Sequence, residues 1–159
     1  MKIVIVGVGA VGASAAYALM ISGLAAEIVL IDVNEAKAEG EAMDLMHGSP
    51  FVRPVTIRAG AYADCAGAKI VVITAGSAQR PGETRLDLVK RNADIFGIMI
   101  PQIVAAAPEA ILLIVSHPPD IRTYARLTPS ALSISRVMGS GTVLDTARLR
   151  ALLGQRLNV

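Results

Sequence analysis

Gly7-Val8-Gly9-Ala10-Val11-Gly12 follows a short β-branched run, Ile3–Val6, and opens a stretch with helical spacing. A G-x-G-x-x-G pattern carries information in this strand-to-helix context. The glycines can turn the chain tightly, let a pyrophosphate approach the backbone and let the helix pack on the strand, with the helix N-terminus facing the anion. The segment therefore predicts an α/β domain that binds a dinucleotide.

Asp32 adds an independent sign of the same site. It ends the second apolar run, Ile28–Ile31, 20 residues after Gly12. A carboxylate there accepts hydrogen bonds from the adenosine ribose hydroxyls and repels a 2′-phosphate, which favours NAD over NADP. A glycine pattern alone is also typical of any strand-helix turn that needs small residues, so the spaced acid is what favours the dinucleotide.

Short β-branched runs alternate with longer stretches of helical spacing along the whole chain. This alternation predicts an α/β fold, a doubly wound parallel six-stranded sheet with helices on both faces. The clearest helix spans about Arg85–Ala107, with a kink expected at Pro101, and a last helix spans about Val143–Leu157. We expect one domain over residues 1–159, with little left for a second. The six runs are Ile3–Val6, Ile28–Ile31, Val55–Ile57, Ile70–Thr74, Ile111–Val115 and Arg136–Met138.

Composition narrows the function classes. A net charge of +2 with scattered basic residues argues against a nucleic-acid partner, and no apolar run approaches the ~20 residues of a membrane span. One cysteine, Cys65, and two histidines are poor material for a metal site, so no metal is expected, and a cytoplasmic location is the default. The 53% hydrophobic content is high, so we expect some apolar surface to await a partner.

Several segments together resemble the lactate/malate dehydrogenase family. The similarity runs from end to end of the chain but covers only the first half of the family's usual length. It implies the Rossmann fold and NAD as cofactor. The segments that carry it are Glu27–Asp32, Gly40–Leu45, Thr74–Gly76, Gln79–Arg85 and Gly139–Arg148.

The resemblance implies roles for four residues in substrate binding and catalysis. Arg85 polarises the 2-oxo group, and Gln79 marks the lactate type where an arginine marks the malate type. Arg148 holds the substrate carboxylate, and Asp145 orients a catalytic histidine. Without the family, Asp145 and Arg148 are merely an i,i+3 helix ion pair worth ~0.2–0.5 kcal/mol.

The resemblance also implies which residues contact the cofactor. They come from the glycine turn, from Asp32 and from the ends of later strands, and His117 is shared with the substrate. The set is Gly7, Gly9, Val11, Gly12, Asp32, Lys37, Tyr62, Ala75, Gly76, Val115, Ser116, His117 and Ser140.

The sequence departs from the family pattern at the proton relay. The family's histidine belongs to a His-Gly-Asp segment that this chain does not contain, and His47 has a structural interpretation at a helix end. His117 stands where the family has an asparagine. Ala61 replaces an acid before Tyr62, and Arg122 and Pro129 replace apolar residues.

Three functions stay open on this basis. The favoured one is an NAD(H)-binding domain that is inactive alone. The second is an active NAD-dependent 2-hydroxy acid dehydrogenase of the lactate type, and the third is a split enzyme whose other half comes from a separate chain that completes the site for a 2-oxo acid. A homo-oligomer is compatible with all three.

Overall fold

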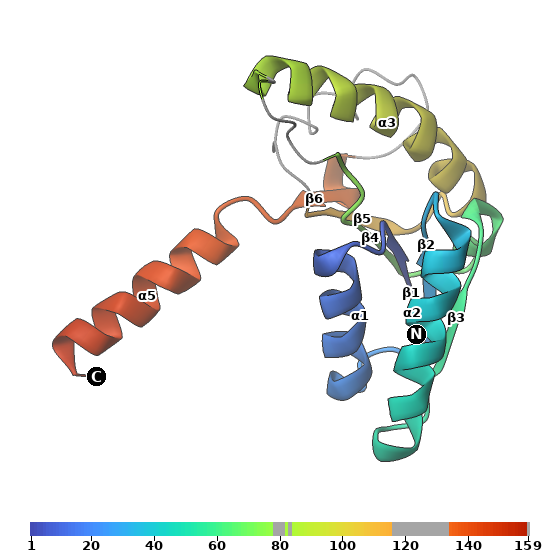
Figure 1. Cartoon of the computed structure of the whole chain (residues 1–159), viewed down its shortest axis with the longest axis horizontal. Coiled ribbons are helices and arrows are strands. Elements are labelled where there is room, and N and C mark those ends of the chain that lie inside the picture. Colours follow the sequence, from blue (N-terminus) through green and yellow to red (C-terminus); the bar gives the residue numbers. More distant parts are fainter. Residues whose placement is uncertain (78–81, 83, 116–133, 159) are drawn as a thin grey trace.

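The computed structural model describes residues 1–77, 82, 84–115 and 134–158. Its strands form a six-stranded, all-parallel sheet in the order β3-β2-β1-β4-β5-β6, which confirms the predicted doubly wound Rossmann fold (Figure 1). Each predicted strand lies within two residues of the observed one. The strands are β1 Lys2–Val6, β2 Glu27–Ile31, β3 Thr56–Ala59, β4 Ile70–Ile73, β5 Ile111–Ile114 and β6 Val137–Gly139. The helices are α1 Ala10–Ser22, α2 Glu35–Gly48, α3 Arg85–Ala106 and α5 Val143–Leu157, with short 3-10 turns η1 Ser49–Phe51, η2 Tyr62–Cys65 and η3 Ile134–Arg136.

Successive residues of a strand point to opposite faces of the sheet, and in the central strands the residues on both faces are apolar. Both faces are therefore covered by helices. On one face Val4 and Val6 pack with α3 residues such as Phe96 and Ile103. On the other face the β1 and β2 side chains pack against α1 and α2; this second core includes Ile3, Ile5, Ile28, Leu30, Ala16, Met20, Ala38 and Ala42.

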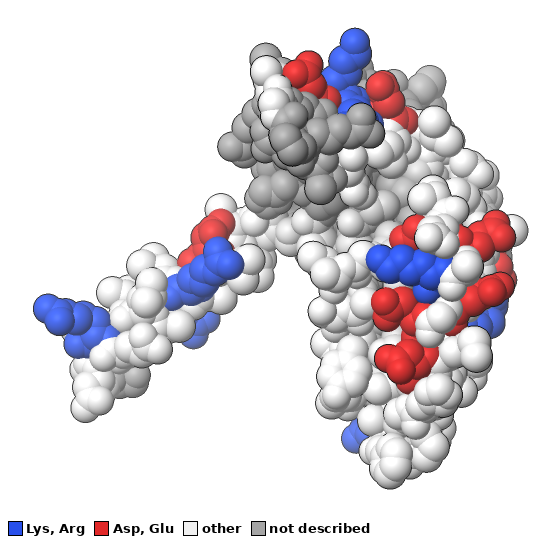
Figure 2. All heavy atoms as spheres, in the orientation of Figure 1, with Lys and Arg blue, Asp and Glu red and all other residues white. Residues whose placement is uncertain are grey.

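Helix α1 is apolar all round and contains no charged residue. Ala16 and Met20 face the sheet, whereas Val11, Tyr17 and Ile21 are each more than half exposed. The uncharged outer surface of α1 is visible as white spheres in Figure 2. A helix of this composition is normally covered on more than one side.

Helix α3 runs from Arg85 to Ala106 without interruption, and Pro101 lies inside it. Figure 1 shows the helix curving along its length over one face of the sheet. A capping box at its start joins Thr84 and Asp87, whose side chains bond each other's backbone amides. Thus the helix begins at a fixed point directly after the segment that follows β4.

Helix α5 has the predicted bounds, Val143–Leu157, but none of its residues is buried. It points away from the sheet in Figure 1 and contacts neither face there. Its leucines are about half-exposed or more, among them Leu144, Leu149, Leu152 and Leu153. This helix and the outer face of α1 are the apolar surface that the composition predicted.

Candidate functional site

The glycine turn between β1 and α1 is built so tightly that two of its glycines leave no room for a side chain. Gly7 has φ +95°, and a Cβ there would lie 2.3 Å from the Ala75 nitrogen. A Cβ at Gly12 would lie 2.0 Å from the Gly7 carbonyl oxygen. Thr74 closes the turn by donating its hydroxyl to that same oxygen at 2.5 Å. The turn is thereby fixed against the end of β4.

Gly9 has a different environment from its two neighbours in the motif. A Cβ built there meets nothing within 4 Å, so the backbone is open on that side. Gly9 is also the N-cap of α1, and its carbonyl accepts the first helical hydrogen bond, from Ala13, at 2.9 Å. The free amides of a helix's first turn favour an anion at such a place. An open backbone at a helix N-terminus fits a pyrophosphate.

The structure joins Asp32 directly to the glycine turn. Its Oδ2 accepts the Val8 amide hydrogen at 2.6 Å, and its Oδ1 accepts the Asn34 amide hydrogen at 3.0 Å. An ionised carboxylate has about four acceptor positions, so two remain for further donors. Because Asp32 is only partly buried, these positions are available to the two hydroxyls of a ribose.

The predicted cofactor contacts Tyr62 and Lys37 lie on two other elements. Tyr62 opens η2 and packs against the α3 side of the core. Burial raises the pKa of its phenol, and the Cys65 and Asp32 charges raise it further. Lys37 lies exposed in the first turn of α2, and its backbone amide donates to the side-chain oxygen of Asn34, the N-cap of this helix.

The remaining described candidates lie at the carboxyl ends of later strands, where ligands of open α/β sheets bind. Ala75 donates its amide to the Val6 carbonyl at 2.9 Å, and Gly76 follows it. Val115 and Ser140 directly follow β5 and β6, and their amides donate to carbonyls at the ends of the neighbouring strands β4 and β5. An open hollow of about 680 Å³ lies beside Ser140, where β6 leads into α5. Gln79, Ser116 and His117 lie outside the described residues.

The expected substrate residues do not all meet at this edge. Arg85 is the first residue of α3. Asp145 and Arg148 lie on α5, with side chains 70% and 68% exposed, and form an i,i+3 pair at 3.9 Å. In this arrangement the pair has the geometry of the bare helix ion pair, and α5 carries it away from the glycine turn (Figure 1).

One residue of structural weight escaped the sequence interpretation. Asn92 on α3 is 2% exposed, and its side-chain oxygen accepts the Ser77 amide hydrogen at 2.8 Å. It thereby holds the start of the segment between Gly76 and Thr84. The signal was an amide side chain within an otherwise apolar helical stripe, which a buried position tolerates only with hydrogen-bond partners.

The described residues contain neither a metal-binding cluster nor a membrane-spanning helix. Within residues 1–77, 84–115 and 134–158, His, Cys, Asp and Glu side chains form no group of three able to hold a metal ion. None of the described helices has the length and apolar character needed to cross a bilayer.

Residues 1–139 match the family model described as lactate/malate dehydrogenase, NAD binding domain. The chain belongs to the lactate/malate dehydrogenase family. It is the family's NAD-binding domain, and NAD is the cofactor that this domain holds.

The relatives of this family member are named lactate dehydrogenases. It is 54% identical to L-lactate dehydrogenase 1 of Clostridium acetobutylicum over 99% of this chain and 50% of that protein. It is 55% identical to L-lactate dehydrogenase of a Synechococcus strain, over 100% of this chain and 52% of the relative. The chain thus spans about half the length of the curated relatives it matches.

Solved structures agree with the sequence relatives. The minor L-lactate dehydrogenase from Enterococcus mundtii, in a ligands-bound form, superposes with a TM-score of 0.93 at 47% identity, covering 99% of this chain and 51% of that one. A lactate dehydrogenase enzyme from a Medee basin deep-sea metagenome library gives a TM-score of 0.92 at 48% identity, with the same coverage.

Proposed function

We propose that this chain binds NAD(H) through the Gly7–Gly12 turn and Asp32, and that it serves hydride transfer between NAD and L-lactate or pyruvate only when a second half completes the site. The observation that carries the proposal is the hydrogen bond from the Val8 amide to Asp32 Oδ2. It fixes the expected ribose acceptor beside the expected pyrophosphate turn.

The residues present fit the cofactor. Gly9 leaves the backbone open at the helix N-terminus, and Asp32 keeps two acceptor positions for the ribose hydroxyls. A 2′-phosphate would bring its negative charge against that carboxylate, so NADPH should bind more weakly than NADH. NAD, when bound, supplies the hydride acceptor, while the chain's own residues bind and orient it.

Substrate chemistry is proposed from the family for four positions. Arg85 would polarise the 2-oxo group, Gln79 would select a monocarboxylate, and Arg148 would hold the carboxylate of the substrate. Asp145 would orient a histidine supplied from outside residues 1–159. The exposed places of Asp145 and Arg148 support a site that is incomplete in this chain alone.

The test is a titration of the purified chain with NADH and NADPH, comparing the native sequence with Asp32→Ala. We expect the substitution to weaken NADH binding on the order of tenfold or more, the loss of two charge-assisted hydrogen bonds, and to affect NADPH far less. Asp94→Ala removes an equally charged, exposed carboxylate on α3 and should change neither affinity. Equal losses for both cofactors in Asp32→Ala would contradict the ribose assignment.

Two further parts of the proposal concern location and assembly. We place the protein in the cytoplasm, where a free buried thiol such as Cys65 stays reduced. We also propose that the exposed apolar faces of α1 and α5 are covered by protein in the functional assembly, either by the second half that completes the site or by further copies.

A further inference from the structure

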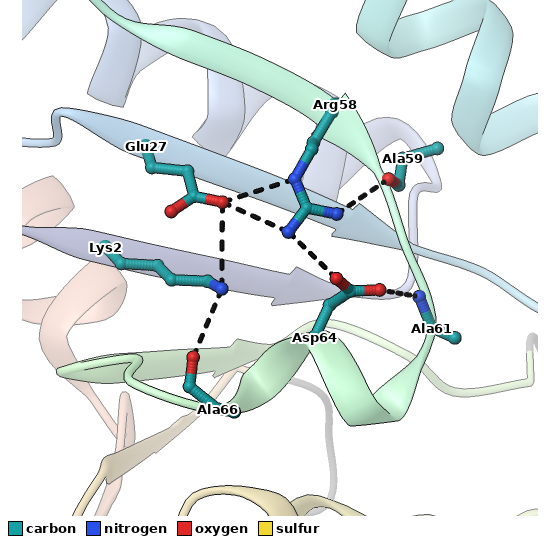
Figure 3. Close-up of polar contacts among 7 residues, drawn as sticks. All are labelled: Lys2, Glu27, Arg58, Ala59, Ala61, Asp64 and Ala66. Carbon is teal, nitrogen blue, oxygen red and sulfur yellow. Dashed lines mark hydrogen bonds and ion pairs between the residues drawn. The ribbon is translucent and has the colours of Figure 1, made fainter.

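Four charged side chains form one network across three strands and η2 (Figure 3). Glu27 Oε1 on β2 accepts hydrogen bonds from Arg58 Nε at 3.2 Å and Nη2 at 3.1 Å, and lies 3.7 Å from Lys2 Nζ. Arg58 Nη2 also lies 2.9 Å from Asp64 Oδ1. Lys2 Nζ donates to the Ala66 carbonyl at 3.2 Å. The network therefore connects the strands to both ends of η2.

Asp64 supports η2 from two sides at once. Its Oδ1 meets the Arg58 guanidinium, and its Oδ2 accepts the Ala61 amide hydrogen at 2.9 Å. The Ala61 hydrogen bond and the Arg58 contact hold the pKa of this carboxyl below its usual range. Ala61 has no side chain able to cap the turn. Asp64 is thus the side chain that caps the N-terminus of η2.

The backbone between β3 and η2 passes close to this carboxylate. A Cβ at Gly60 would lie 2.8 Å from Asp64 Oδ2 and 2.7 Å from Val29 Cγ1. The Gly60 amide meanwhile donates to the Leu30 carbonyl at 2.9 Å, continuing the β3 ladder. The turn thus leaves η2 little room to shift toward the sheet, and Asp64 and Arg58 keep it from moving away.

We propose that Arg58 and Asp64 are positioning residues for the adenosine end of the NAD site, acting through η2, which contacts α3 and β2, to hold Tyr62 in place against the core. Tyr62 lies between Ala61 and Asp64 in sequence, so the hydrogen bond from the Ala61 amide to Asp64 spans it. Arg58 itself pairs with Val29, three residues before Asp32, and contacts Glu27 and Asp64 rather than the glycine turn. The inference rests on the proposed cofactor site.

The first test measures NADH and ADP-ribose affinity of the 159-residue chain by calorimetry. Arg58→Gln and Asp64→Asn should each weaken both ligands on the order of tenfold, within the range for groups coupled through a shared element. Glu109→Gln is the matched control, because it breaks a comparable surface pair, Glu109 to Arg136 at 2.6 Å, at the end of α3. It should leave both affinities unchanged.

A cycle with Tyr62→Ala shows whether the effect passes through the ring. If Arg58 acts by placing Tyr62, then Arg58→Gln should cost little once Tyr62 is already alanine. Full additivity of the two losses would mean that Arg58 acts independently of Tyr62 and would overturn the proposal.

The second test reads Tyr62 without any ligand. In a Tyr17→Phe/Tyr124→Phe background Tyr62 is the only tyrosine, and its phenolate absorbance can be titrated alone. Removal of the Arg58 cation by electrostatics alone would raise the Tyr62 pKa, whereas loosening η2 would expose the ring and lower it toward ~10. We expect Arg58→Gln to lower it.

The outcomes separate this inference from the function beneath it. If the native chain binds neither NADH nor ADP-ribose, the proposed cofactor site fails. If the native chain binds both and Arg58→Gln and Asp64→Asn bind equally well, the site stands and the positioning role is wrong. An unchanged or raised Tyr62 pKa in Arg58→Gln also contradicts the positioning role.

Discussion

Gly9 and Gly12 belong to one motif, yet a side chain would meet different surroundings at each. At Gly12 a Cβ would stand 2.0 Å from the Gly7 carbonyl oxygen and 2.8 Å from the Thr74 hydroxyl, both within the protein. At Gly9 the same atom would enter open space. The fold itself therefore requires a glycine at position 12. At position 9 a glycine leaves the backbone open to an approaching ligand.

This difference predicts opposite effects of the same substitution at the two glycines. Gly12→Ala should destabilise the chain by several kcal/mol, on the order of 3, because backbone must move to admit the methyl group. The free energy of unfolding of Gly9→Ala should lie within about 0.5 kcal/mol of that of the native chain. Its NADH affinity should nevertheless be weaker by about tenfold or more. Urea unfolding and NADH titration of both variants measure this. A Gly9→Ala chain with native affinity would remove Gly9 from the cofactor's path.

The sequence predicted the residues of the glycine turn and Asp32 because their spacing follows from local strand and helix geometry. Arg58 with Asp64 and Ser77 with Asn92 were not predicted as pairs. Those contacts join residues on different elements, and no periodicity reveals which polar side chain of one element meets which of another. They depend on sheet register and on the path of η2, which only the structure supplies.

At the scale of elements, α3 holds both ends of the segment that follows β4. Asn92 accepts the Ser77 amide hydrogen at one end, and the Thr84–Asp87 capping box fixes the other. The segment between them contains Gln79, a proposed substrate residue, and leads to Arg85. Helix α3 thus anchors both ends of the segment that contains the proposed substrate residue Gln79.

Replacing Asn92 tests this anchoring. Asn92→Ala removes a buried acceptor and leaves the Ser77 amide without it, which should cost about 1–3 kcal/mol of unfolding free energy. Gln102→Ala is the control on the same helix, since Gln102 is exposed and its amide donates to the Ile98 carbonyl of its own helix. Thermal melts of both variants should differ clearly. Equal melting temperatures would show that the Asn92 hydrogen bond does not contribute to stability.

Strand positions were predictable to within two residues, because the central strands β1, β2 and β4 are buried, largely β-branched runs. Helix α5 was predicted with its exact ends, yet its place was not. Its amphipathic pattern indicates that one face is covered, while the described chain offers it no cover. Hydrophobic periodicity indicates that one face of a helix is covered, but it does not identify the element or protein that covers it.

For the molecule as a whole, the pH dependence of stability should carry the signature of the buried thiol. Burial raises the pKa of Cys65 to about 11, whereas an unfolded cysteine ionises near ~8.5. Above that lower pKa the unfolded state releases its proton first, so the stability contribution is complete below ~8.5 and is lost as the pH rises toward 11.

We expect the free energy of unfolding to fall between about pH 9 and 11 by on the order of 2 kcal/mol from this group. The raised pKa of Tyr62 acts in the same direction at higher pH. Cys65→Ala should be less stable at neutral pH because of its cavity, but its alkaline decline should be shallower. Urea unfolding at a series of pH values measures both, and parallel declines would exclude the thiol as the cause.

The last question at the scale of the whole molecule is whether these 159 residues alone can oxidise L-lactate. General acid-base catalysis contributes ~10²–10⁴-fold, and it requires a histidine that Asp145 can orient. In the described chain Asp145 is 70% exposed on α5 beside Arg148, and His47 lies on α2 in the groove toward β3. Neither arrangement places an imidazole at the glycine turn.

We therefore expect the purified chain to form NADH from L-lactate at no more than a trace rate, even at saturating NAD, and at the same rate after Arg148→Ala or His117→Ala. A full-length L-lactate dehydrogenase in the same assay is the positive control. The reason is that the residues acting as one catalytic unit lose most of their benefit when a single member is absent. A robust rate abolished by both substitutions would instead show a minimal dehydrogenase in which His117 serves as the base and α5 folds back over the sheet.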